Sequence, residues 1–228
     1  MLKMTEKKQL KIKIIKDGPY CVFGAVPLSE KIITPVGKHY EYREGKKLPQ
    51  KENYSLCRCG ETKTPPFCDG YHNQIDFDGK ETASKLDYKT RAELLEGKEI
   101  DLRDDHRCAF LRFCHTEKGD TWNLIKESDK KEERELALKS AEECLAGRLT
   151  AVSKSGEILE KEFEPAIEIL QDPEKNVGSA IIVKGQIEIE GADGERYEPR
   201  NSVALCRCGK SDNKPFCDCS HVHVNFQE

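Results

Sequence analysis

The sequence lacks a long run of apolar residues, and none approaches the roughly eighteen that a membrane-spanning helix needs. Residues 1–16 are rich in lysine, but they lack the apolar core of a signal peptide and contain neither arginine nor serine, which transit peptides favour. A net charge of −4 and a pI near 6.0 provide no positive excess for binding nucleic acid. We therefore expect a soluble cytoplasmic protein that binds neither membranes nor nucleic acid.

The sequence also lacks the usual patterns of catalysis. It shows no nucleophile paired with a base, no glycine-rich phosphate loop and no carboxylates spaced for acid–base chemistry. We therefore expect no enzyme activity. Apolar residues are scarce as well, at 36% against 35% charged residues, so we expect a core that is small relative to the surface.

Cysteine, by contrast, is abundant. The chain has eleven cysteines, an odd number, and most of them cluster as C-x-C followed by a further Cys and a His. This clustering favours metal ligation in a reducing compartment over a framework of disulfides.

Most of these cysteines belong to one stretch that occurs twice. Residues 56–72 have the sequence LCRCGETKTPPFCDGYH, and residues 205–221 have LCRCGKSDNKPFCDCSH, with identity at ten of the seventeen positions. Every Cys and His of the first ligand set recurs 149 positions later. The two candidate ligand sets are Cys57, Cys59, Cys68 and His72, and Cys206, Cys208, Cys217 and His221.

The spacing within each copy suits metal binding. In an extended C-x-C segment the two sulfurs point to the same side, and residues four apart, such as Cys68 and His72, share one face of a helical turn. Three thiols and one imidazole suit either a zinc ion or an iron–sulfur cluster. The C-x-C spacing is unusual for zinc, but the spacing alone leaves both metals open.

Three further pairs of residues support the ligands. Asp69 and Asp218 stand where a carboxylate can cap the free amides of the following turn. Thr62 and Ser211 offer hydroxyl groups that could donate to a sulfur of the site. Gly60 and Gly209 allow a tight loop after the first two cysteines.

Both copies resemble the signature of the CDGSH (NEET) iron–sulfur family, C-x-C-x2-S/T-x3-P-x-C-D-G-S/A/T-H. The first copy departs from it at Tyr71, where a small residue is usual, and the second at Cys219, which replaces the glycine. The resemblance implies two 2Fe–2S clusters, one for each set of three Cys and one His named above. Single-copy relatives pair as homodimers, so it also implies a monomer with an intramolecular pseudo-dimer.

The resemblance implies a soluble protein that passes electrons or whole clusters to redox or cluster-acceptor proteins. Two alternatives stay open: a structural zinc-binding interaction module, and an accessory electron-transfer subunit of a redox enzyme. Because a protonated imidazole cannot bind iron, we also expect reduction to be coupled to protonation at His72 and His221, and the clusters to become labile as the pH falls.

The pattern of apolar residues predicts an α+β fold. Residues 9–16, 20–26, 30–35 and 38–43 are candidate strands, and shorter counterparts precede the second copy. We predict a first CDGSH-type module over 1–85, a helical insert over 86–165 and a second module over 166–228, with the modules packed about a pseudo-twofold axis.

The predicted insert has helices over 89–98 and 130–148 and three cysteines, Cys108, Cys114 and Cys144. It resembles a divergent ferredoxin-like segment, and this resemblance leaves open a third cluster bound by these cysteines. Packing of small apolar thiols between helices is the favoured interpretation. At Cys219 we expect backbone strain if the residue has positive φ, or a thiol that substitutes for His221 or acts as a redox-active neighbour.

Overall fold

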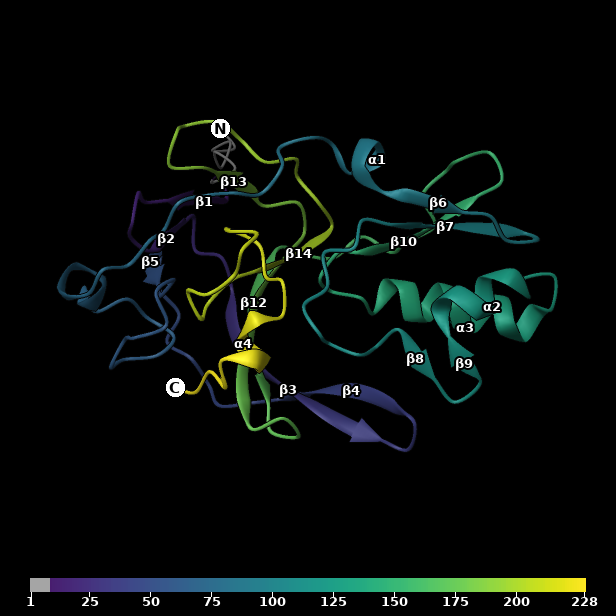
Figure 1. The fold of residues 1–228 in the computed structure, drawn as a ribbon, viewed down its shortest axis with the longest axis horizontal. Coiled ribbons are helices and arrows are strands. Elements are labelled where there is room, and N and C mark those ends of the chain that lie inside the picture. Colours follow the sequence, from purple (N-terminus) through teal and green to yellow (C-terminus); the bar gives the residue numbers. More distant parts are fainter. Residues whose placement is uncertain (1–8) are drawn as a thin grey trace, which may run out of the picture.

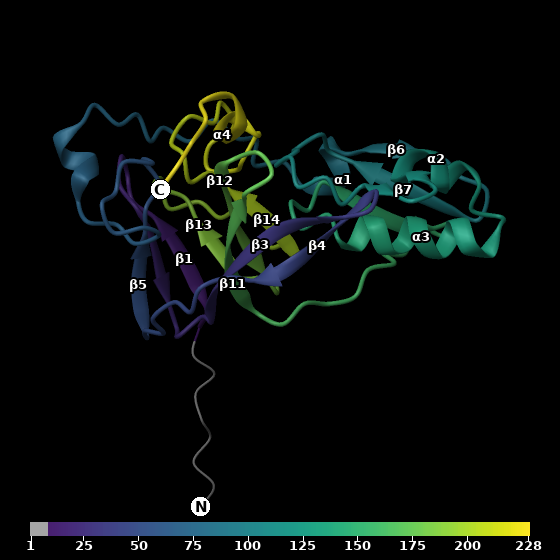
Figure 2. The same ribbon diagram turned by 90° about the horizontal axis from the view of Figure 1, so that it is seen from below.

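A computed structural model describes residues 9–228, and residues 1–8 of the lysine-rich start lie outside it. The fold is α+β, as expected, with strands predominating (Figure 1). Across the described residues, no helix is long and apolar enough to cross a membrane. The two cysteine-rich stretches and the segment between them occupy different parts of the molecule, with the segment 86–165 extending to one side (Figures 1 and 2).

The first sheet has four strands. Its strand order is β13-β1-β2-β5. The alternation of isoleucine and lysine near the N-terminus forms β1, in which Ile12 and Ile14 are fully buried. The bounds are β1 Lys11–Ile14, β2 Tyr20–Phe23, β5 Asn53–Leu56 and β13 Glu188–Glu190.

The second sheet has five strands in the order β14-β12-β11-β3-β4. Its central strands, β11 and β12, are buried along nearly their whole length, as in a sheet covered on both faces. The bounds are β3 Leu28–Val36, β4 His39–Glu44, β11 Ala166–Asp172, β12 Val177–Lys184 and β14 Ser202–Leu205.

Each of the two sheets combines strands from both halves of the sequence. Strand β3, from the N-terminal part of the chain, pairs in parallel with β11, and β13, from the C-terminal part, pairs in parallel with β1. The first sheet therefore contains one strand from the C-terminal part of the chain, β13, and the second contains two from the N-terminal part, β3 and β4. Both sheets contribute to one apolar core, which includes Ile12, Tyr20, Ile181 and Leu205.

Residues 86–165 form an α+β unit and not the purely helical insert that the sequence suggested. The helix predicted over 89–98 ends after one turn, and the chain continues into a strand that joins a three-stranded sheet in the order β10-β7-β6. The second predicted helix is present as α3, with Gly147 in a left-handed conformation beyond its end. The bounds are α1 Tyr88–Arg91, β6 Glu93–Leu95, β7 Ile100–Asp104, β8 His115–Thr116, β9 Gly119–Asp120, α2 Thr121–Lys126, α3 Lys131–Glu142 and β10 Leu149–Ser153.

Candidate metal centres

Each candidate centre begins where a strand ends. Strand β5 ends at Leu56 and β14 at Leu205, so each C-x-C pair directly follows a strand whose last residue is buried. The Sγ atoms of Cys57 and Cys59 lie 3.6 Å apart, and those of Cys206 and Cys208 lie 3.8 Å apart. The strands therefore present the two thiols of each pair on the same side, as the spacing predicted.

The remaining two candidate ligands come together on a short helical turn. In the first copy a 3-10 helix, η1, spans Tyr71–Gln74, and in the second copy α4 spans Ser220–His223. The Cys68 Sγ lies 3.4 Å from Nδ1 of His72, and the Cys217 Sγ lies 3.4 Å from Nδ1 of His221. In both copies Nδ1 is therefore the ring nitrogen that faces the thiol.

These distances match those between two ligands of one tetrahedral metal ion. With metal–sulfur bonds of about 2.3 Å and metal–nitrogen bonds of about 2.0 Å, two sulfurs bound to one ion lie about 3.8 Å apart, and a sulfur and a nitrogen about 3.5 Å apart. Both kinds of pair are therefore spaced to share one metal ion. Within residues 9–228, no three His, Cys, Asp or Glu side chains are grouped so as to hold one ion. Each copy offers one thiol pair and one thiol–imidazole pair at these distances.

In each C-x-C pair, the neighbouring thiol and nearby backbone amides favour a thiolate at the first cysteine, and the pKa of the second is raised. The pKa of Cys57 is lowered to about 6 by its hydrogen bond with Cys59 and by the backbone N–H groups of Gly60 and Thr62. The pKa of Cys206 is lowered to about 7 by the equivalent bond with Cys208 and by the N–H groups after it. A thiol that deprotonates near neutral pH is a ready metal ligand.

The two aspartates fix the turns, as predicted. Asp69 accepts hydrogen bonds from the N–H groups of Lys63 and Tyr71, at 2.8 and 3.0 Å. Asp218 accepts from the N–H groups of Asp212 and Ser220, at 2.8 and 3.0 Å. Each carboxylate therefore connects the loop after the C-x-C pair to the turn that carries the histidine.

The expected role of Thr62 and Ser211 is wrong. The Thr62 hydroxyl donates to the Phe67 carbonyl at 2.6 Å, and the Ser211 hydroxyl donates to the Phe216 carbonyl at 2.7 Å. Each hydroxyl has one proton, and it is used to close the loop. Neither group has a proton left for a sulfur.

The two centres differ in exposure. In the first, Cys68 and His72 are partly exposed, whereas in the second Cys217 is 4% and His221 2% exposed. The segment 86–165 accounts for part of this cover, since Cys217 packs with Phe113 and Leu145. Burial, with the positive charge of Arg207, lowers the pKa of His221 to about 4, so its imidazole is neutral near pH 7.

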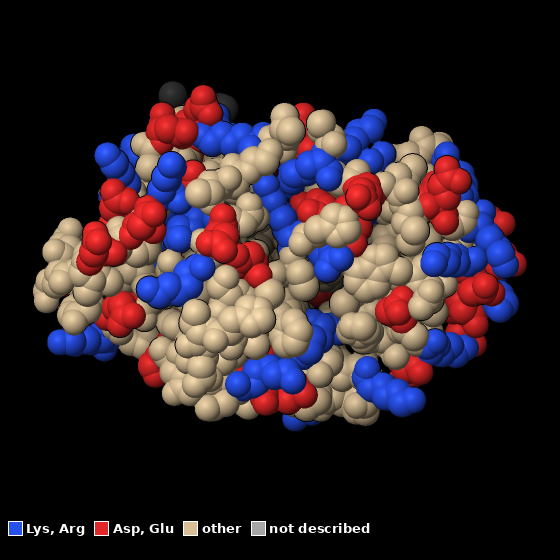
Figure 3. All heavy atoms as spheres, in the orientation of Figure 1, with Lys and Arg blue, Asp and Glu red and all other residues tan. Residues whose placement is uncertain are grey.

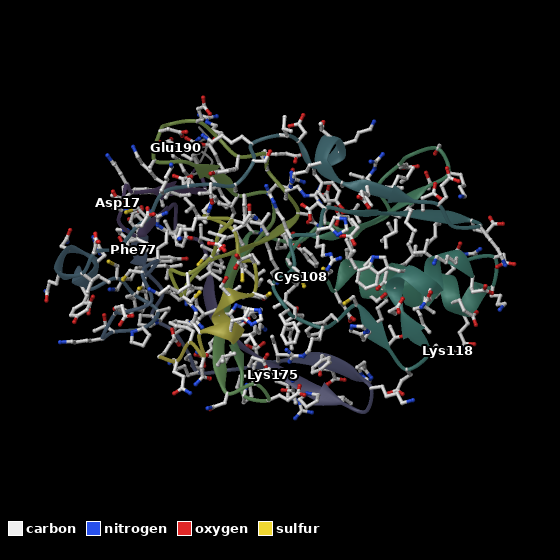
Figure 4. The ribbon with its side chains drawn as sticks, in the orientation of Figure 1. Asp17, Phe77, Cys108, Lys118, Lys175 and Glu190 are labelled. Carbon is white, nitrogen blue, oxygen red and sulfur yellow. The ribbon has the colours of Figure 1, made fainter. Side chains whose placement is uncertain are left out.

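Cys219 adopts the strained conformation anticipated from the sequence. Its φ is 68°, in the left-handed region, and Gly70 at the equivalent position has a φ of 87°. Its side chain lines a cavity of about 500 Å³ together with Cys108 from the segment 86–165. Figure 4 shows Cys108 on the side of that segment that faces the C-terminal loop. Despite the presence of Cys219, His221 faces Cys217 in the second centre in the same way that His72 faces Cys68 in the first centre.

The other cysteines of the segment 86–165 are packed in apolar clusters. Cys114 packs around Leu102 and Ile125, and Cys144 lies between this cluster and the one around Ile33. Burial raises the pKa of Cys114 to about 11 and that of Cys144 to about 12, which keeps both thiols protonated. The packing role favoured for these two residues agrees with their environment.

Sequence reasoning missed two buried arginines. Arg58 and Arg207 occupy the middle positions of the two C-x-C pairs and are 1% and 2% exposed. The signal was available, because the same arginine occurs between the cysteines in both copies. A residue between two that face one side of an extended segment must point to the other side, here into the core.

The two cysteine loops lie against each other. A Cβ added to Gly60 would come within 2.6 Å of the Cys208 carbonyl oxygen, and one added to Gly209 within 2.4 Å of the Cys59 carbonyl oxygen. The backbones of the two candidate centres are thus in direct contact.

A family model described as "iron-binding zinc finger CDGSH type" matches the chain at residues 17–73 and 179–222, together less than half of its length. The matched regions contain both sets of candidate ligands and the strands before them. No curated protein and no solved structure matches the chain.

Proposed function

Because both cysteine-rich regions of this chain belong to the CDGSH-type iron-binding family, we propose that it is an electron carrier with two 2Fe–2S clusters. One cluster is held by Cys57, Cys59, Cys68 and His72. The other is held by Cys206, Cys208, Cys217 and His221.

The pairwise arrangement of the donors carries this proposal. A zinc ion takes four ligands around one point, whereas the two irons of a 2Fe–2S cluster take two protein ligands each. The thiol pair at 3.6 Å and the thiol–imidazole pair at 3.4 Å of the first centre suit two separate metal ions. The second centre repeats this arrangement at 3.8 and 3.4 Å.

We further propose that the two modules, 1–85 and 166–228, form an intramolecular pair about a pseudo-twofold axis, with 86–165 as an insert. Three observations support this pairing: the parallel pairing of β1 with β13 and of β3 with β11, the reciprocal contacts of Gly60 and Gly209, and the repeat of both pairs of donors. A single chain then supplies what a homodimer of one-module chains supplies with two.

When bound, each cluster supplies a site that accepts one electron. The chain sets how readily it does so. One neutral imidazole in place of a thiolate makes the oxidised centre less negative than one with four thiolates, which favours reduction. Backbone N–H groups beside Cys57 and Cys206 favour negative charge on the sulfurs. The partners would be redox proteins of a reducing compartment such as the cytoplasm, and the proposal requires no catalytic residue.

Donation of a whole cluster is the second candidate function, and the exposure of the first centre favours it. Cys68 and His72 are partly exposed, so an acceptor's thiols could reach the iron that these residues hold. The face that carries α4 shows side chains of both charges interspersed (Figure 3), which provides no large single-sign field to select the partner.

Spectroscopy of the purified full chain tests the proposal. We expect a red-brown protein with absorption above about 400 nm and, after chemical reduction, a paramagnetic signal from each reduced cluster. Replacing His72 by Cys, and separately His221 by Cys, should each alter the signal of one cluster and leave the other unchanged. A colourless protein in all three cases would refute the proposal.

A further inference from the structure

The buried arginine between the paired cysteines is bonded in a similar way in both centres. Arg58 donates from Nε to the Gly18 carbonyl at 2.8 Å and from Nη2 to the Ile15 carbonyl at 2.9 Å. Arg207 donates from Nε to the Ser179 carbonyl and from Nη2 to the Leu170 carbonyl, both at 2.9 Å. Arg58 thus ties its cysteine loop to the turn between β1 and β2, and Arg207 ties its loop to β11 and β12.

Each guanidinium also lies over an aromatic ring. The Arg58 guanidinium is 5.4 Å from the ring centroid of Phe77, and that of Arg207 is 5.3 Å from the ring centroid of Phe226. Phe226 in turn packs against Cys206 and Cys208. Phe226 therefore contacts both the Arg207 guanidinium and the paired cysteines.

A second connection joins Arg207 to the histidine of its centre. The Ser179 carbonyl accepts from Arg207, and the hydroxyl of the same residue lies 3.4 Å from Nε2 of His221. The Arg207 side chain thus contacts both Phe226, which packs against the paired cysteines, and Ser179, which lies beside His221. Because the Arg207 guanidinium is buried, little water screens its charge from the second centre.

The remaining donor, Nη1, distinguishes the two centres. In the first, Nη1 of Arg58 donates to the Gly79 carbonyl at 2.8 Å, so all three bonds of this guanidinium go to backbone carbonyls. In the second, Nη1 of Arg207 pairs with the carboxylate of Glu228. Glu228 stands 149 positions after Gly79, in the register that relates the two ligand sets.

At the first centre, a carboxylate is linked to Arg58 only indirectly, through Gly79. Asp17 accepts a hydrogen bond from the Gly79 N–H at 3.0 Å, while the carbonyl of the same glycine accepts from Arg58. Asp17 and Phe77 both lie at the end of the molecule that carries β1, β2 and β5 (Figure 4). Within residues 9–228, the Arg58 guanidinium forms no direct ion pair, whereas the Arg207 guanidinium does.

We propose that Arg58 and Arg207 are positioning residues for the paired cysteines, and that Glu228 lowers the reduction potential of the second cluster by neutralising Arg207. This inference rests on the proposed function. Reduction adds one negative charge to a cluster, and a nearby positive charge stabilises the reduced form. Glu228 offsets part of this charge at the second cluster, whereas no carboxylate of residues 9–228 pairs directly with Arg58 at the first.

The neighbouring charges do not replace this effect. Glu30 shares the Gln171 amide with Glu228, but it lies 3.5 Å from the Lys46 ammonium, which offsets its charge. Arg112, which approaches the second centre from the segment 86–165, pairs with Asp172.

The test is a redox titration of the iron-loaded full chain in wild type and Glu228→Gln, followed by visible absorption and by the paramagnetic signals. The substitution keeps an oxygen that can accept from Arg207 and removes the charge. Two one-electron steps are expected in wild type. The step that moves in His72→Cys belongs to the first cluster. In Glu228→Gln the other step should move to a higher potential, and the first should stay in place.

Two matched variants serve as controls. Asp17→Asn removes the carboxylate that is linked to Arg58 through Gly79. It should raise the potential of the first cluster by less than Glu228→Gln raises that of the second. Glu132→Gln removes an exposed carboxylate on α3 and should move neither step. An unchanged second step in Glu228→Gln, a downward shift, or equal shifts of both steps would overturn the inference while leaving the two clusters established. A chain that takes up no iron would instead refute the proposed function.

The positioning role has a readout that does not require the cluster. In the iron-free full chain, Glu228→Gln should lower the melting temperature, because Arg207 loses its ionic partner inside the protein. Glu132→Gln should leave the melting temperature unchanged. Equal melting temperatures for wild type and Glu228→Gln would contradict the positioning role.

Discussion

Gly60 lies directly against the carbonyl group of Cys208, and a Cβ at this glycine would come within 2.6 Å of the oxygen and 2.9 Å of the carbon. Gly209 makes the reciprocal contact with Cys59. Because Cys59 and Cys208 are themselves candidate ligands, the position of each pair of thiols depends on the loop of the other. Damage to one centre should therefore affect its neighbour.

Replacing Gly60 by Ala should destabilise both centres. The new Cβ would clash with a backbone carbonyl, and φ at this position is +87°, which side-chain-bearing residues rarely adopt. We expect a loss of about 2–3 kcal/mol in the free energy of unfolding and a reduced iron content at both sites. Denaturant unfolding and metal analysis measure the two effects.

Gly156→Ala is the matched control for this variant. Gly156 has a φ of +85°, but a Cβ there would meet nothing within 4 Å. Gly156→Ala should lower the free energy of unfolding by only about 1 kcal/mol, which is the cost of a positive φ in a residue with a side chain. Equal costs for the two variants would show that the contact between the loops is not needed.

Tyr20→Phe should weaken the second centre selectively. Tyr20 lies in β2, yet its buried hydroxyl lies within 2.9 Å of the Cys206 carbonyl and 3.0 Å of the Pro215 carbonyl. Removing it leaves these acceptors without this donor, at a cost of about 1–2 kcal/mol, and should speed loss of the second cluster. Tyr54→Phe, which removes a buried hydroxyl bonded to the Val26 carbonyl, should have a similar cost without that selectivity.

The protein should lose stability in acid partly through Asp104. Burial alone would raise the pKa of this carboxyl, but hydrogen bonds from Arg148, the His106 N–H and Trp122 lower it below its ordinary value. A lowered folded pKa gives stability that is present above the unfolded pKa, about 3.9, and is lost as the pH falls through the folded pKa.

Asp104→Asn tests this contribution. At pH 7, the free energy of unfolding of this variant should be about 3 kcal/mol lower than that of the wild type, because Arg148 loses its ionic partner in a largely buried site. The difference from wild type should shrink as the pH is lowered, which denaturant unfolding at several pH values would measure. A difference that stays constant down to low pH would contradict this assignment.

The two clusters should be lost at different rates. Cys68 and His72 are partly exposed, whereas Cys217 and His221 are nearly inaccessible, so protons and chelators reach the first centre more easily. Under mild acid, visible absorption should decay in two phases, and His72→Cys should slow the fast one. Loss of the second cluster first, or a single phase in wild type, would argue against the assigned difference in access.

Much of the site could be predicted from the sequence because its geometry is local. The alternation of an extended segment places the C-x-C thiols together, and one helical turn brings Cys68 to His72. The repeat at a constant separation indicated two equivalent centres. The alignment of Cys219 with Gly70 pointed to the position where a positive φ would cause strain, and the residue has that φ.

Features that depend on distant contacts could not be predicted in this way. Parallel pairing of β3 with β11 joins residues far apart in the chain and has no local pattern. The segment 89–98 contains good helix formers, but Glu93–Leu95 gains more by pairing with β7, so tertiary structure outweighs helix propensity there. The hydroxyls of Thr62 and Ser211 were misassigned because the carbonyls that they contact become neighbours only when the loops fold.

Metal and sulfide analysis of the full chain, purified without oxygen, tests the central claim most directly. The account predicts about four iron and about four inorganic sulfide per chain, two of each for every set of three cysteines and one histidine. About two zinc ions per chain, with no sulfide and no visible colour, would contradict it and would establish a structural zinc protein instead.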